Sequence, residues 1–276
     1  MTTWFITGCS SGFGRALTQR VLEAGDKAVI TARNPESVAD LAEAYPDTAL
    51  SVPLDVRNEE QIVSAVDAAR QHFGAVDVLV NNAGYGYRAA VEEGEPEAIR
   101  DLFETNYFGA VHMIKAVLPL MREQGNGMII NISSIAGQHS APGSGYYAAS
   151  KAALESTSEA LRQEVAPLGI RVSVVQPGPF RTDFFSRSLK QADTALEAYA
   201  ETAGKRRKEN DPTTNNQPGD PDRAAAAIMQ LAELEDPPMR LVLGKAANRV
   251  AETDLNKQLD DLMDWEHLGL NTDFAE

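Results

Sequence analysis

The chain has 276 residues, of which 43% are hydrophobic and 24% charged, and its 40 acidic and 25 basic residues give a net charge of −15. Such a chain can bury a large core within one α/β domain, and its composition is that of an ordinary globular protein. The negative charge disfavours nucleic acid, anionic membrane surfaces and acidic carrier proteins as partners.

The single cysteine, Cys9, cannot form a disulfide within the chain, so we expect a reducing, cytoplasmic location. The N-terminus lacks the basic segment and the long apolar run of a signal peptide, and no apolar run is long enough to span a bilayer. No group of His, Cys and Asp residues has the spacing of metal ligands, so no metal is expected.

Short apolar segments alternate along the chain with segments of helical periodicity. Strands are expected at residues 4–7, 27–32, 49–54, 76–80, 128–132, 171–176 and 241–243. Helices are expected at residues 13–24, 37–44, 59–73, 97–123, 147–165 and 222–234. This alternation predicts an α/β fold with a Rossmann-type doubly wound parallel sheet, built as a single domain over residues 1–276.

After Gly178 the alternation breaks down, and residues 180–220 contain only scattered helical pieces. A basic cluster at residues 205–208 is predicted to be a solvated helix face. Asp220 and Pro221 then provide an N-cap and a first helical position for the helix that follows. The C-terminal extension, residues 252–276, carries an apolar stripe at helical spacing, which suits either a core or an oligomer contact. The stripe consists of Leu255, Leu259, Leu262 and Met263.

The first expected strand runs into a glycine-rich turn in which a helix begins. A pyrophosphate needs close approach to the backbone, which glycine permits, and a helix N-terminus adds free N–H groups and partial positive charge. Strand, turn and helix together are the context of a dinucleotide site, although the spacing Gly-x-x-x-Gly-x-Gly also suits an ordinary tight turn. The candidate cofactor-binding residues in this turn are Gly8, Ser10, Ser11, Gly12, Phe13 and Gly14.

The second expected strand ends at Ala32-Arg33-Asn34, where a carboxylate would favour NAD by binding the free ribose 2′-hydroxyl. Arg33 could instead pair with a 2′-phosphate, and Ser11 could add a hydroxyl contact, so the sequence favours NADP(H). A solvated arginine at a strand end is the alternative reading of Arg33. Arg15 is expected to face solvent on its helix.

Three motifs occur in the order of a known family: the turn at residues 7–14, then Asn81-Asn82-Ala83-Gly84, then Tyr147-Ala148-Ala149-Ser150-Lys151. Over about the first 185 residues the chain resembles the compact, single-domain branch of the short-chain dehydrogenase/reductase family. The resemblance implies hydride transfer between NADP(H) and a carbonyl or secondary alcohol, with residues 180–220 facing the substrate. It also implies a homodimer or homotetramer formed through helices 97–123 and 147–166.

The resemblance implies further roles along the cofactor and the proton path. Asn81 would hold the central sheet, and Asn106 would hold a catalytic water. The remaining implied cofactor contacts run from the adenine to the nicotinamide amide: Asp55, Val56, Asn82, Ala83, Gly84, Pro177, Gly178 and Thr182.

Tyr147 and Lys151 are four residues apart on one expected helix face. The lysine ammonium, together with the positive nicotinamide ring of the oxidised cofactor, is expected to lower the pKa of the phenol, which could then act as general acid in reduction and general base in oxidation. Lys151 would also bind the nicotinamide ribose. The family places its alkoxide-stabilising serine thirteen residues before the tyrosine, which selects Ser134, with Ser133 as a supporting neighbour.

His139 suits a pocket edge or the surface better than a proton relay, because Tyr147 already fills the acid–base role. Aromatic residues are expected to line a pocket for a moderately hydrophobic carbonyl or alcohol. Two other functions are weighed against this enzyme: a non-catalytic NADP(H)-binding sensor or scaffold, and a carrier-protein-dependent ketoacyl reductase. The expected aromatic residues are Tyr85, Tyr87, Phe180, Phe184 and Phe185.

Overall fold

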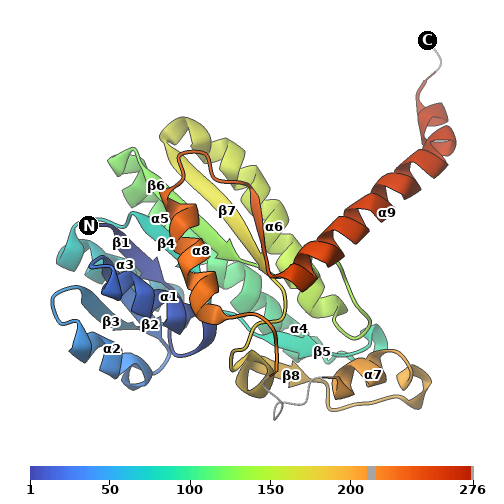
Figure 1. The fold of residues 1–276 in the computed structure, drawn as a ribbon, viewed down its shortest axis with the longest axis horizontal. Helices are drawn as coiled ribbons and strands as arrows, with labels where there is room; N and C mark the ends of the chain where they lie inside the picture. Colours follow the sequence, from blue (N-terminus) through green and yellow to red (C-terminus); the bar gives the residue numbers. More distant parts are fainter. Residues whose placement is uncertain (210–215, 275–276) are drawn as a thin grey trace.

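The computed structural model describes residues 1–209 and 216–274. Its main sheet is parallel, with the strand order β3-β2-β1-β4-β6-β7-β9 (Figure 1). The strands are β1 (Thr3–Ile6), β2 (Lys27–Ala32), β3 (Ala49–Pro53), β4 (Val78–Asn81), β6 (Gly127–Ile132), β7 (Ile170–Pro177) and β9 (Arg240–Leu243). The predicted doubly wound parallel sheet is confirmed, with strand ends that differ from the predicted ones by one or two residues.

Helices cover both faces of this sheet because its strands are apolar on both sides. One face is covered by α1 (Gly12–Glu23), α2 (Ala39–Ala44) and α8 (Pro221–Glu233). The other is covered by α3 (Glu59–Phe73), α5 (Gly109–Gln124) and α6 (Gly145–Val165). The predicted N-cap of α8 is confirmed, since the Asp220 side chain accepts a hydrogen bond of 2.9 Å from the Asp222 N–H.

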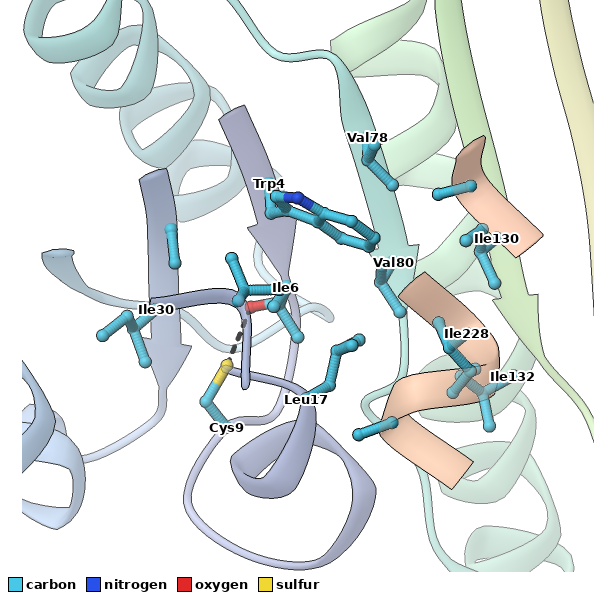
Figure 2. Packing of buried hydrophobic residues seen from close by; sticks show 14 of the residues in the cluster. Trp4, Ile6, Cys9, Leu17, Ile30, Val78, Val80, Ile130, Ile132 and Ile228 are labelled. Atoms are coloured by element: carbon cyan, nitrogen blue, oxygen red, sulfur yellow. Dashed lines mark hydrogen bonds between the residues drawn. The ribbon is translucent and has the colours of Figure 1, made fainter. Parts of the chain in front are cut away.

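Figure 2 shows the core on the α1 and α8 side. Ile6 of β1, Val80 of β4 and Ile130 of β6 point to this face, where Leu17 of α1 and Ile228 of α8 cover them. Successive residues of a strand point to opposite faces, so the residues between them fill the second core. Packing on both faces fixes the parallel sheet, so the carboxyl ends of its strands lie along one edge. The candidate site lies along that edge.

The helix expected over residues 97–123 contains a π-helical turn. The chain forms α4 (Pro96–Phe103), a π-helical turn η3 (Glu104–Phe108) and then α5. Asn106 in that turn is buried, and its side chain bonds both the N–H and the carbonyl of Tyr85, at 3.0 and 2.9 Å. The predicted helix is confirmed in its extent, and its π-helical turn was not predicted because apolar periodicity does not register one extra residue in a turn. Likewise, the helix expected at 37–44 begins as a 3₁₀ turn, η1 (Pro35–Val38).

A second, small parallel sheet pairs β5 (Gly86–Arg88) with β8 (Leu189–Gln191). Neither strand was predicted, since three residues are too few to show a period. The pairing lays the segment after Gly178 across the loop that follows β4. Part of the expected substrate-facing segment, residues 210–215, lies outside the described residues.

The basic cluster at 205–208 falls in α7 (Ala203–Lys208) and is only partly solvated. Arg207 is 13% exposed and pairs at 2.6 Å with Glu93, whose side chain is 2% exposed. The prediction of a solvated helix face is therefore wrong at Arg207, because a carboxylate far away in sequence draws its guanidinium inward.

The last helix, α9 (Lys245–Gly269), packs on the body only at its start, through Ala247 and Ala251. Its remainder projects away from the rest of the molecule (Figure 1). The C-terminal stripe is exposed along its length, with Leu255, Leu259 and Leu262 at 56%, 52% and 69%. The core alternative for this stripe is therefore wrong. No helix in the described ranges combines the length and apolarity that a membrane span requires.

Candidate active site

The carboxyl ends of β1 and β4 meet where the strand order reverses, which is the position at which doubly wound sheets bind ligands. The Thr7 hydroxyl, just after β1, accepts hydrogen bonds from the N–H groups of Asn82 and Ala83, at 2.9 and 3.0 Å. The Asn82 amide in turn donates to the carbonyls of Thr7 and Gly8, at 2.8 and 3.0 Å. These bonds place two of the predicted motifs side by side.

The glycine turn has the shape of a phosphate cradle. Gly12 has a φ of +59°, which side chains rarely adopt, and a Cβ on Gly14 would collide with the Gly8 carbonyl oxygen. Ser11 precedes α1 without making a side-chain cap, and the first turn of α1 has no acidic residue. The N–H groups and the positive dipole end of α1 are thus left for an anion, so the turn fits the pyrophosphate of a dinucleotide.

Arg33 is exposed just after β2 and lies near Asp55, which is two residues beyond the end of β3. Hydrogen bonding from Arg57 is the main cause that lowers the pKa of Asp55, and the charge of Arg33 lowers it further. Arg33 and Asp55 therefore lie close together beyond the carboxyl ends of β2 and β3. Arg15 differs from the expectation, because it is only 34% exposed and pairs with Asp40.

Ser134, Tyr147 and Lys151 converge at the carboxyl end of β6. Lys151 is buried, and its Nζ donates a 2.9 Å hydrogen bond to the carbonyl of Ile132, the last residue of β6. The same Nζ lies 6.0 Å from the centre of the Tyr147 ring, one helical turn earlier in α6. The Ser134 hydroxyl accepts a 3.1 Å bond from the Ala136 N–H, which holds it at the start of the next turn.

The ionisation of this group departs from expectation. Burial raises the pKa of Tyr147 to about 12, with hydrogen bonding to Ser134 acting in the opposite direction. Burial lowers the pKa of Lys151 to about 8, against the opposing charge of Glu155. The expected lowering of the Tyr147 pKa is not seen in the protein without its cofactor, because desolvation of the phenolate is the largest cause and raises the pKa. Tyr147 is protonated at neutral pH.

Asn106 lies beside the same group. Its amide donates to the Ser150 hydroxyl at 3.2 Å, next to Lys151 in sequence. A Cβ on Gly84 would lie 3.0 Å from Asn106 Oδ1 and 3.4 Å from Lys151 Nζ. Gly84 therefore packs closely against the side chains of both residues. The side-chain atoms of Asn106 are engaged with Tyr85 and Ser150.

The segment after β7 connects the end of that strand to β9 and to the glycine turn. The Gly178 N–H donates to the Leu243 carbonyl at 3.0 Å, which ties this turn to β9. Thr182 reaches the glycine turn, since its Cβ is 3.6 Å from the position that a Cβ on Gly12 would take. Thr182 therefore lies beside the glycine turn, whereas Gly178 packs against Ala247 at the start of α9.

The expected aromatic lining is only partly present. The rings of Phe184 and Tyr147 are 6.1 Å apart, and those of Phe184 and Phe185 are 5.5 Å apart, so these two phenylalanines lie at the site. Tyr87 is buried and bonds Glu95 instead, and Phe180 packs on Phe13 at 5.0 Å. Tyr85 lies partly exposed under the Lys190 ammonium, 4.6 Å from its ring centre.

His139 occupies the surface position that was favoured for it, 48% exposed and 3.1 Å from Asp254. In the described ranges, no group of three or more His, Cys, Asp or Glu side chains could hold a metal ion.

One buried acid at this site was missed. Glu155 follows Lys151 by one turn of α6, and its side chain is 6% exposed. It accepts hydrogen bonds from Ser133 at 2.5 Å and from Gln176 at 2.8 Å. The signal available in the sequence was its spacing, four residues after Lys151 and eight after Tyr147 on one helix face.

Comparison with known proteins agrees with this geometry. A family model described as short chain dehydrogenase matches residues 2–193. A 3-ketodihydrosphingosine reductase from Bacteroides thetaiotaomicron is 38% identical over 241 residues, which cover 87% of this chain and 86% of the relative. The crystal structure of a short-chain dehydrogenase from Streptomyces avermitilis is 43% identical, with a TM-score of 0.92 over 99% of each chain. A serine dehydrogenase complexed with NADP+ is 28% identical, with a TM-score of 0.76 over 88% of this chain and 94% of that one.

Proposed function

Because the chain belongs to the short-chain dehydrogenase family, we propose that it is an NADP(H)-dependent oxidoreductase that interconverts a carbonyl and a secondary alcohol. The observation that carries this proposal is the convergence of Ser134, Tyr147 and Lys151 beside a glycine turn that fits a pyrophosphate. A sensor or scaffold would need neither the proton donor Tyr147 nor the hydroxyl of Ser134.

In the direction of reduction, bound NADPH supplies a hydride to the carbonyl carbon. Tyr147 donates its phenolic proton to the carbonyl oxygen, a role for which its raised pKa keeps it protonated. Ser134 donates a hydrogen bond to the same oxygen as negative charge develops there. Lys151 binds the nicotinamide ribose and stabilises the resulting phenolate, and Asn106 holds a water that returns the proton.

NADP(H) is proposed over NAD(H) because Arg33, and not a carboxylate, ends β2. The NADP+ bound to the related serine dehydrogenase supports this choice. The adenosine and nicotinamide contacts proposed for this chain are those of the glycine turn together with Asp55, Val56, Asn82, Ala83, Gly84, Pro177, Gly178 and Thr182.

The substrate is proposed to be a moderately hydrophobic ketone, aldehyde or secondary alcohol. Phe184 lies beside Tyr147 and Phe185 lies beside Phe184, and the segment at residues 180–220 that carries them is proposed to face the substrate within one domain. The Bacteroides relative is named for the reduction of a ketone, which supports a carbonyl substrate here. We propose a cytoplasmic homodimer or homotetramer, a location that the single buried thiol of Cys9 fits.

The test measures NADPH oxidation with a panel of aliphatic and aromatic ketones of increasing chain length. Tyr147→Phe removes the proton donor but not the ring, so activity is expected to fall by about 10² to 10⁴. NADPH affinity, followed by calorimetry, is expected to stay within about twofold, because the phosphate cradle is untouched.

The matched control is Tyr146→Phe, the neighbouring tyrosine, whose hydroxyl bonds the Val91 carbonyl at 2.5 Å. This variant is expected to keep activity within a few-fold of wild type. Tight NADPH binding without turnover of any carbonyl by the wild type would instead favour the sensor alternative.

A further inference from the structure

The carboxylate of Glu155 joins the separate chain segments that carry the proposed catalytic groups. Its Oε1 accepts the Ser133 hydroxyl at 2.5 Å, and Ser133 directly precedes Ser134. Its Oε2 accepts the Gln176 amide at 2.8 Å, and Gln176 directly precedes the turn at Pro177 and Gly178. One buried group on α6 therefore fixes both the end of β6 and the end of β7.

The packing around this carboxylate leaves little room for rearrangement. A Cβ on Gly137, in the turn after Ser134, would collide with Glu155 Oε1. Because a carboxylate only accepts, it also orients the Gln176 amide, whose Oε1 is left without a partner among the described residues. A buried polar atom without a hydrogen bond is costly, so the orientation of Gln176 is maintained at the expense of stability.

The charged groups that face Glu155 come from two elements. Lys151 and Glu159 lie one turn before and one turn after it on α6, and Arg240 of β9 donates to it at 3.2 Å. Arg240 also bonds Glu159 at 2.8 Å, so its charge is shared between the two acids. Beside Lys151, the other titratable side chain on the same face is Tyr147.

We propose that Glu155 is a positioning residue for the proposed reaction, holding Ser134 through Ser133 and the Pro177–Gly178 turn through Gln176. The inference rests on the proposed function, because it assigns Glu155 to the same site. The negative charge of Glu155 also raises the pKa of Lys151, against the lowering that burial causes. Removing that charge is expected to let Lys151 deprotonate at lower pH.

The test compares Glu155→Gln with wild type in reduction of one carbonyl by NADPH between pH 6 and about 10. We expect kcat to fall roughly tenfold or more, because Ser134 and the nicotinamide turn lose their common anchor. The Michaelis constant for NADPH is expected to change less than kcat, since the glycine turn is remote from Glu155. The alkaline fall in kcat is expected to move to lower pH.

Two variants separate this role from a merely structural one. Glu159→Gln is the matched control, because it removes an acid that shares Arg240 but has no bond to Ser133 or Gln176, and its pH profile is expected to match wild type. Glu155→Asp keeps the negative charge on a shorter side chain. Its kcat is therefore expected to fall, while the pH at which kcat declines on the alkaline side stays near that of wild type.

The Lys151 proton can also be followed without activity, by an NMR titration of isotope-labelled lysine in which its signal is identified by its absence in Lys151→Met. A lower titration point in Glu155→Gln than in wild type is expected. An active wild type with unchanged kcat, pH profile and Lys151 titration in Glu155→Gln would overturn this inference and leave the proposed function intact. A wild type that reduces no carbonyl would overturn the function, and the NMR result would still decide the charge effect.

Discussion

Arg33 illustrates how a single side chain can choose between two cofactors that differ by one phosphate. It is exposed at the end of β2, and its charge reaches Asp55, which already has a guanidinium partner in Arg57. A second carboxylate at this corner would repel a 2′-phosphate, whereas a free arginine fork can bind it through two hydrogen bonds.

Arg33→Ala is expected to weaken NADPH binding by about tenfold to a hundredfold, the range of a lost charge-assisted hydrogen bond. NADH affinity is expected to stay nearly constant, because NADH has no 2′-phosphate. Calorimetric titration of both cofactors measures the difference, with Arg15→Ala as control, since Arg15 already pairs with Asp40. Equal weakening for both cofactors would rule out a phosphate contact by Arg33.

At the scale of elements, the segment after β7 is held by a clamp on Glu93. One oxygen of this buried carboxylate accepts the Leu196 N–H at 2.8 Å, and the other pairs with Arg207 at 2.6 Å and accepts the Ala90 N–H at 2.8 Å. Together with the pairing of β5 and β8, this clamp keeps the segment after Gly178 lying against the loop that follows β4.

Glu93→Gln breaks a buried ion pair, which costs about 3–5 kcal/mol where the remaining charge stays buried. We expect faster hydrogen exchange in β8 and α7 and a rise of roughly tenfold in the Michaelis constant for the carbonyl, with NADPH affinity unchanged. The neighbouring Glu92→Gln is the control, because Glu92 is bonded only at the surface, to the Tyr199 hydroxyl at 2.6 Å. Unaltered exchange in both elements would show that the clamp does not hold the segment.

At the scale of the whole molecule, the projecting part of α9 carries apolar side chains that the rest of the same chain does not cover. Its apolar stripe continues the face on which Ala247 and Ala251 pack against the body. Two such tails side by side would bring their acidic residues together, whereas α7 of a second copy exposes the basic side chains of Lys205 and Lys208. We propose that each tail lies on the body of a second copy in a symmetric exchange.

Deletion of residues 255–276 is expected to halve the mass of the assembly, measured by sedimentation, while the hydrogen bond between His139 and Asp254 is retained. Replacing Leu255, Leu259 and Leu262 together by Gln is expected to have the same effect. Lys257→Gln is the control, because residue 257 points away from the stripe. An assembly of unchanged mass after the deletion would place the interface elsewhere, on α5 and α6.

Much of the fold follows from local sequence. The parallel sheet could be predicted because each strand and helix carries its own apolar period, and that period survives without knowledge of its neighbours. The glycine turn, Asn82, Tyr147 and Lys151 could be singled out for a similar reason, since each motif is short and sits at a strand end or on one helix face.

Tertiary structure decided what depends on residues far apart in the chain. Asn106 in the π-helical turn bonds the backbone of Tyr85, and Arg207 is drawn inward by Glu93, more than a hundred residues away in sequence. The raised pKa of Tyr147 and the lowered pKa of Lys151 reflect desolvation by a packed environment that no motif encodes. The sequence by itself thus determined the sheet and the position of its reactive edge. Only the folded chain decided how Glu155, Ser133 and Gln176 meet there, because burial and long-range hydrogen bonds arise from packing and not from local pattern.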